Sequence, residues 1–171
     1  MKRQKGFSLI ELLIVVAIIL IIAAIAIPNL IRSKIAANES SAVASVRTIS
    51  TAETTYASSW GVGYSPDLAS LGGATPCTTA TPASACIIDP LLSTGAFVKS
   101  GYIFAALGNT LLGGSFQGFE ANATPSIVDL TGKRAFCTDQ SGVIRFNTTG
   151  LAVGTGAGNC AAAALLSHVG R

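Results

Sequence analysis

The chain has 171 residues, of which 50% are hydrophobic and 11% are charged. This length leaves room for one long helix and one modest domain, but hardly for two domains. The formal net charge is +3, but removing Lys2, Arg3 and Lys5 leaves eight basic and eight acidic side chains. The basic balance therefore belongs to the N-terminal end and does not indicate nucleic-acid binding.

An apolar stretch from Leu12 to Ile27 contains no charged or polar side chain and stops at Pro28. At about 1.5 Å per residue, a helix over residues 7–27 is roughly 31 Å long, close to the ~30 Å hydrocarbon core of a bilayer. The basic residues before it favour a cytoplasmic N-terminus, with the rest of the chain outside the cytoplasm. Pro28 removes a helical hydrogen bond and crowds the preceding turn, which predicts a kink.

Glu11 interrupts this apolar segment. An acidic side chain at the centre of a membrane helix costs about 2.5 to 3.5 kcal/mol, and less near the end, so Glu11 either reaches the head-group layer or has a partner. Cleavage between Gly6 and Phe7 would create such a partner, the α-amine of Phe7. In a packed array of these helices, Glu11 of one subunit can pair with the amine of the next.

The segment Lys5-Gly6-Phe7-Ser8-Leu9-Ile10-Glu11, with the apolar stretch that continues to Ala26-Ile27-Pro28, resembles the leader, cleavage site and N-terminal helix of type IV pilins and pseudopilins. The resemblance implies that a prepilin peptidase cuts after Gly6 and methylates the amine of Phe7. It also implies that Glu11 guides subunit docking and that the helix becomes the core of a filament. The fold it implies is α+β, with a long N-terminal helix packed on a C-terminal antiparallel sheet.

Helical spacing resumes beyond Pro28. The apolar residues that follow it are Ile35, Ala42, Val43, Val46, Ile49, Ala52 and Tyr56. Arg47, Ser50 and Glu53 lie at intervening positions, so we expect one helix over about residues 7–59, with its second half packed across a globular head.

Short segments rich in aromatic and β-branched residues follow the helix and its connecting loop. They predict a sheet of three to four strands, at residues 102–106, 117–122, 134–138 and 143–147. Asp139 to Gly142 is expected to form the hairpin turn between the last two.

These elements give a predicted domain organisation. It consists of a leader at 1–6, a transmembrane or filament-core half of the helix at 7–30, and a globular head at 31–171. Within the head we expect the amphipathic half of the helix, an αβ-loop at 61–100, a β-meander at 101–148 and a tail at 149–171. The end of the tail, from Leu165, is expected to be a short helical turn or irregular.

Four cysteines, Cys77, Cys86, Cys137 and Cys160, follow the apolar stretch, where an oxidising compartment permits disulfides. Three pairings are open. We favour Cys77 with Cys86, which closes a short loop, and Cys137 with Cys160, which ties down the tail. A zinc site is disfavoured because the chain has no CxxC pair and only one histidine, His168.

The sequence carries no pattern typical of an enzyme, a cofactor site or a metal site. It lacks a GxxxxGK[ST] loop, so the ATPase that drives assembly is expected to be a separate protein. A hydrolase triad is disfavoured by the single imidazole. The acids Asp67, Asp89, Glu120, Asp129 and Asp139 do not have the spacing of a calcium loop. Glycosylation sequons at Asn38, Asn122 and Asn147 are weak signals.

The expected function is that of a structural subunit of a type IV pilus. The precursor would cross the inner membrane once, then enter a homo-oligomeric helical filament through an inner-membrane assembly platform and become part of an extracellular pilus. A pseudopilin of a type II secretion system is an alternative. Another is a soluble exported protein, because Ala24-Ile25-Ala26 has the form that an ordinary signal peptidase accepts. Adhesion, motility, DNA uptake and conductivity are not distinguished by this sequence.

Overall fold

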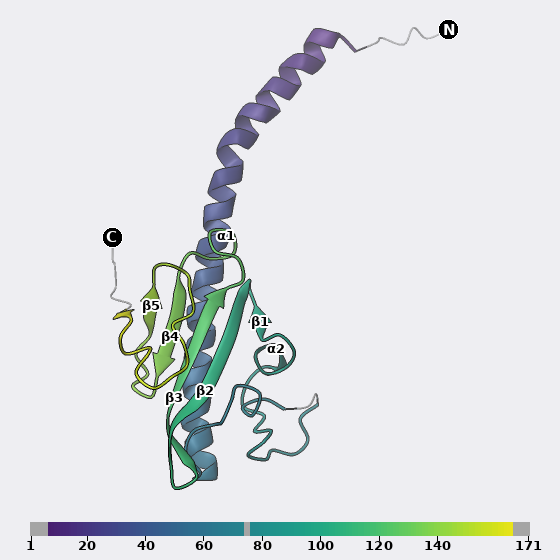
Figure 1. Cartoon of the computed structure of the whole chain (residues 1–171). Helices are drawn as coiled ribbons and strands as arrows, with labels where there is room; N and C mark the ends of the chain where they lie inside the picture. The colour runs from purple at the N-terminus through teal and green to yellow at the C-terminus, as the bar shows by residue number, and fades with distance from the viewer. Residues whose placement is uncertain (1–6, 74–75, 166–171) are drawn as a thin grey trace. The chain divides into compact units, whose positions relative to one another are not determined.

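The computed structural model describes residues 7–73 and 76–165. Gly6 and the rest of the expected leader, and the tail beyond Leu165 with His168, lie outside the described residues. The chain divides into two compact units, Met1–Lys34 and Ile35–Arg171. Helix α1 (Leu9–Trp60) begins in the first unit and continues through the second, close to the predicted bounds (Figure 1).

In the first unit, α1 has no polar face. Its large apolar side chains are all exposed, from 80% at Leu9 to 42% at Ile31. Pro28 lies inside the helix and does not end it, and the kink expected there stays a prediction. Of the described helices, α1 is the one long and apolar enough to cross a membrane.

In the second unit, one face of α1 is buried. The apolar residues on it are Ile35, Ala42, Val46, Ile49, Ala52 and Tyr56, as the spacing predicts. The same face also buries Glu39 and Glu53. The assignment of Glu53 to an intervening polar position was therefore wrong, because this residue follows Ile49 by four positions and precedes Tyr56 by three, which is the spacing of the buried face.

The second unit contains a six-stranded antiparallel sheet whose spatial order equals the chain order. Its strands are β1 (Val98–Lys99), β2 (Tyr102–Leu112), β3 (Ser115–Pro125), β4 (Ala135–Asp139), β5 (Arg145–Asn147) and β6 (Ala164–Leu165). The α+β architecture is confirmed, but three to four strands were too few. The missed strands β1 and β6 have two residues each, too short for an alternating pattern.

The sheet packs one face onto α1. Side chains of β2 alternate, so that Tyr102, Phe104 and Ala106 are buried while the residues between them are exposed. Phe119 of β3 and Phe136 of β4 complete this core with the buried face of the helix. Burial of large aromatic and aliphatic side chains is the main source of stability in such a layer.

The αβ-loop at 61–100 contributes a second part of the core. It contains the short helix α2 (Pro90–Ser93), capped by the side chain of Asp89, which accepts from Leu91 N at 2.9 Å. Leu68 and Leu71 are buried and lie in a turn. The loop is thus a packed connector in the residues described.

Candidate functional site

Phe7 and Ser8 precede α1, and Glu11 lies in its first turn. The first helical hydrogen bond here runs from Leu12 N to Ser8 O, at 3.2 Å. The Glu11 carboxylate therefore lies in the first turn, near the positive end of the helix dipole. Phe7 is 74% exposed, so the atom that would become the new α-amine is at the accessible head of the helix.

The surface of this helical segment is apolar and uncovered. In the apolar window of α1, none of the described residues is buried by the rest of the chain. An apolar surface of this extent needs either lipid or other apolar helices around it. The structure thus brings together an exposed Phe7, one acid and a long lipid-compatible helix.

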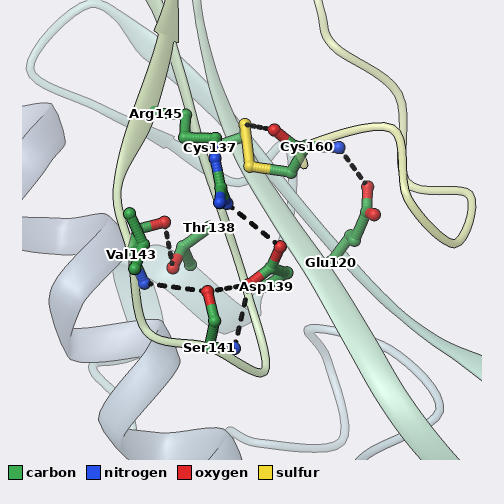
Figure 2. Close-up of polar contacts among 8 residues, drawn as sticks. All are labelled: Glu120, Cys137, Thr138, Asp139, Ser141, Val143, Arg145 and Cys160. Carbon is green, nitrogen blue, oxygen red and sulfur yellow. Dashed lines mark hydrogen bonds and ion pairs between the residues drawn. A yellow bond between two sulfur atoms is a disulfide. The ribbon is translucent and has the colours of Figure 1, made fainter. Parts of the chain in front are cut away.

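The second candidate region surrounds a disulfide in the sheet. Cys137 on β4 is bonded to Cys160, with 5.7 Å between their Cα atoms, and both residues are fully buried (Figure 2). This bond fastens the segment after β5 to the middle of the sheet. Cys77 is paired with Cys86, whose Cα lies 6.1 Å away, and this bond closes the short loop expected from the sequence.

Glu120 on β3 holds the same segment through its carboxylate. Oε2 accepts from Cys160 N at 3.0 Å (Figure 2). Burial raises the pKa of Glu120, while the backbone N–H groups of Cys160, Gly158 and Asn159 oppose the shift. The carboxylate therefore fixes Cys160 within a Gly/Ala-rich segment that has few side chains of its own to pack.

Asp139 organises the neighbouring hairpin. Its Oδ2 lies 3.2 Å from Arg145 Nη1, and its Oδ1 accepts from the backbone N–H of Ser141 at 2.8 Å and from the Ser141 hydroxyl (Figure 2). Gly142 N donates to Asp139 O at 2.9 Å, closing the predicted turn. Glu120 on β3 and Asp139 on β4 lie opposite each other in the strand register. The two acids therefore make their hydrogen bonds in the same part of the sheet.

The other acids considered for a calcium site, Asp67, Asp89 and Asp129, bind residues in or next to loops. Asp67 accepts from Ser70, while Asp89 and Asp129 lie near Lys99 and Lys133 at 3.9 and 3.8 Å. Within residues 7–73 and 76–165, no three His, Cys, Asp or Glu residues are grouped as metal ligands.

All three sequon asparagines make side-chain hydrogen bonds within the fold. The Asn122 amide is buried and donates to Gly154 O at 2.6 Å, while the Asn38 amide donates to Thr131 O at 2.8 Å. The Asn122 side chain is thus inaccessible to a glycosylating enzyme in the folded head.

Glu39 is a structural residue that the sequence pattern missed. It accepts from Lys133 N, Arg134 N and the Arg134 guanidinium. Its position four residues after Ile35 and three before Ala42 places it on the buried face. That spacing could have identified it.

Comparison with known proteins adds to this geometry. Residues 1–27 match the family described as a prokaryotic N-terminal methylation motif. The N-terminal segment therefore resembles that of the type IV pilins. The chain is 48% identical over 54 residues to the type IV major pilin protein PilA of Myxococcus xanthus, a match that covers 32% of this chain and 24% of the relative.

Two further relatives are also named as pilus or fimbrial proteins. Identity is 59% over 39 residues with the type IV wide pilus major component PilA4 of Thermus thermophilus, covering 23% of this chain and 30% of the relative. It is 79% over 29 residues with a fimbrial protein of Pseudomonas aeruginosa, covering 17% and 19%. The chain thus spans less than a third of the length of these pilin relatives. No solved structure matches it.

Proposed function

We propose that this chain is a structural subunit of a type IV pilus. The observation that carries the proposal is the uncovered apolar surface of α1 from Leu9 to Ile31, headed by Phe7 and Glu11 in the methylation motif. A surface of this kind is compatible with a bilayer before assembly and with a bundle of identical helices afterwards. The same helix is therefore surrounded first by lipid and later by the helices of neighbouring subunits.

In this proposal a prepilin peptidase removes residues 1–6 by cutting after Gly6 and methylates the amine of Phe7. The precursor crosses the inner membrane once, through residues 7–30, with a cytoplasmic N-terminus and the head, 31–171, outside. An inner-membrane assembly platform, driven by a separate ATPase, transfers the subunit into a helical homo-oligomer. That filament is the extracellular pilus.

Glu11 selects the docked position of an incoming subunit. In the apolar filament core, an unpaired carboxylate and an unpaired ammonium are each strongly disfavoured. Pairing Glu11 of one subunit with the Phe7 amine of the next removes both penalties together, so the lowest free energy belongs to one helix register. Methylation of a primary amine leaves it able to carry the positive charge.

Intact mass and N-terminal sequencing of the mature protein test the processing step. The expected chain begins at Phe7 and carries one added methyl group. A mature chain that begins at Ile27 would mean removal of an ordinary signal peptide, and the assembly role of Glu11 would be rejected.

Glu11→Ala tests assembly separately. The variant is expected to insert and to be cleaved normally, but to be missing from filaments sheared from the cell surface. Ser33→Ala is a matched control, because the Ser33 hydroxyl donates only to Asn29 O of its own helix in the described structure. Recovery of the wild-type protein in sheared surface filaments separates a pilus subunit from a pseudopilin of a type II secretion system.

A further inference from the structure

The loop between β3 and β4 exposes a cluster of large apolar side chains. Ile127, Val128 and Leu130 are 55%, 40% and 53% exposed. Leu68 and Leu71, in the loop after α1, are buried at 2% and 0%, whereas Leu151 in the tail is 64% exposed. The loop between β3 and β4 gathers three exposed apolar side chains within four residues.

Hydrogen bonds fix the shape of this loop. Thr131 N donates to Ile127 O and Asp129 N donates to Gly132 O, both at 2.9 Å. The Thr131 hydroxyl also accepts from Ile127 N at 3.1 Å. A loop closed on itself in this way has little freedom to fold its apolar side chains back against the core.

The loop, which we call the apolar loop (residues 127–130), lies at the end of the head where α1 enters it. Asn38 of α1 donates to Thr131 O at 2.8 Å, and Glu39 accepts from Lys133 N at 3.0 Å. In Figure 1 this green segment after β3 crosses α1 at the end of the head opposite the β2–β3 hairpin.

The opposite end of the head is marked by that hairpin. Tyr64, shortly after the end of α1, donates its backbone N–H to Phe116 O at 2.9 Å. The hairpin exposes Leu111 and Leu112, at 64% and 70%. The head thus presents apolar side chains at both ends, and the two sites can be compared directly.

The chain between the apolar span and the loop's attachment point is short. Only Arg32–Ala37 separates Ile31 from Asn38, and at about 1.5 Å per residue this helical stretch covers on the order of 10 Å. The head-group layer on each side of a bilayer is roughly 5 to 8 Å thick. Arg32 and Lys34 in this stretch suit an anionic lipid surface.

We propose that, in the membrane-held precursor, the apolar loop inserts into the interfacial layer of the bilayer. The occupant of this surface is lipid, because the loop is hydrogen-bonded to α1 at Asn38, only seven positions beyond Ile31 in the sequence, and because the stretch between them carries Arg32 and Lys34. Ile127 and Leu130 enter the boundary between head groups and acyl chains, as the apolar side chains of membrane-surface proteins do. This inference rests on the membrane-held state of the proposed function.

Tryptophan quenching by brominated lipid tests the proposal on the full chain. Trp60 is the single tryptophan, so a Trp60→Phe background carrying Leu130→Trp reports on the apolar loop alone. The protein is reconstituted into vesicles of phosphatidylethanolamine and phosphatidylglycerol, with or without bromine on the acyl chains. Fluorescence is expected to be roughly halved by the brominated lipid, as for a side chain at the interface.

Two matched variants make every outcome decisive. Leu112→Trp, at the far end of the head, is expected to be unquenched, while Ile19→Trp, in the span, is expected to be strongly quenched. If Ile19→Trp is quenched but Leu130→Trp behaves like Leu112→Trp, the apolar loop does not touch lipid and the inference is overturned. A blue-shifted but unquenched Leu130→Trp would overturn it too, since protein would then cover the loop. If Ile19→Trp itself is unquenched, the membrane-held state fails, and both proposals fail with it.

Discussion

The Glu39 carboxylate binds the Arg134 side chain at two points, with Oε2 2.9 Å from Nε and 2.6 Å from Nη2. Its other oxygen accepts the backbone N–H groups of Lys133 and Arg134, at 3.0 and 3.2 Å. The guanidinium also lies 5.5 Å from the ring centres of Phe136 and Phe146. One side chain of α1 therefore fixes the entry to β4, although the two residues are 95 positions apart.

Replacement of Glu39 by Ala is expected to lower the free energy of unfolding by about 2 kcal/mol, because it leaves two backbone N–H groups and a half-buried guanidinium without their acceptor. Urea unfolding of the full chain in detergent, followed by Trp60 fluorescence, measures the change. Asp129→Asn is the control: its ion pair with Lys133 is exposed, so its loss should change stability by less than about 0.5 kcal/mol. Equal effects of the two substitutions would contradict the assigned role of Glu39.

Glu53 makes the stability of the head depend on pH. Burial raises its pKa to about 7 from 4.5; hydrogen bonds from Ser65 oppose this, and the charge of Asp67 adds to it. The folded state therefore holds the proton more tightly than the unfolded chain does. The free energy of unfolding should fall as pH rises from about 4.5 to 7, by roughly 3 kcal/mol in total, and change little from this cause above that range.

Glu53→Gln is expected to remove most of this fall, and urea titrations at pH 4.5, 6 and 8 measure it. Glu120 will leave a smaller fall of the same sign, because its pKa is also raised by burial. A Glu53→Gln protein with the full wild-type pH dependence would show that Glu53 is not the titrating group.

Glu120→Ala should loosen the segment that Cys160 ties to the sheet. Its loss leaves the buried N–H group of Cys160 without its acceptor, while the disulfide still limits how far the segment can move. Amide hydrogen exchange in this segment should become roughly 10- to 100-fold faster, with β3 itself unchanged. Gln117→Ala, at an exposed position of the same strand, should have no such effect. Unchanged exchange in Glu120→Ala would mean that the disulfide alone holds the segment.

Gly132 is required by the close approach of Tyr102. A Cβ at this position would overlap the Tyr102 hydroxyl and ring, and that hydroxyl donates to Arg134 O at 2.8 Å. Gly132→Ala should lower the free energy of unfolding by about 2 kcal/mol. In a Tyr102→Phe background the loss should be smaller, because the most crowded atom is gone. Strictly additive losses in a double-mutant cycle would show that the two residues do not interact.

Periodicity was sufficient to predict the helix and the main strands. The spacing from Ile35 to Tyr56 identifies the buried face of α1, and the β-branched and aromatic segments identify β2 to β5. The same spacing rule places Glu39 and Glu53 on that face, but acids are rarely buried without a partner. Their partners, Arg134 and Ser65, are set by tertiary structure, and no local pattern shows them.

The residues proposed for cleavage and assembly can be recognised from the sequence. Gly6, Phe7 and Glu11 stand in one continuous motif, so the sequence alone suggests their roles. The C-terminal region contains no comparable sequence motif from which its contacts could be predicted. Glu120 accepts the backbone N–H of Cys160 in a Gly/Ala-rich segment, and a backbone N–H group is the same in every sequence, so only the fold reveals the contact.

The order of the sheet has a consequence for how the head folds. Every strand pairs with its immediate neighbour in the chain, so no strand has to be inserted between two that have already formed. In the proposed membrane-held precursor, each new strand can add to the last edge as the chain emerges behind α1, which keeps the contacts between strands local and favours fast folding. The strands of the head can therefore form in their order along the chain, and the Cys137–Cys160 disulfide then fixes the C-terminal segment to the sheet.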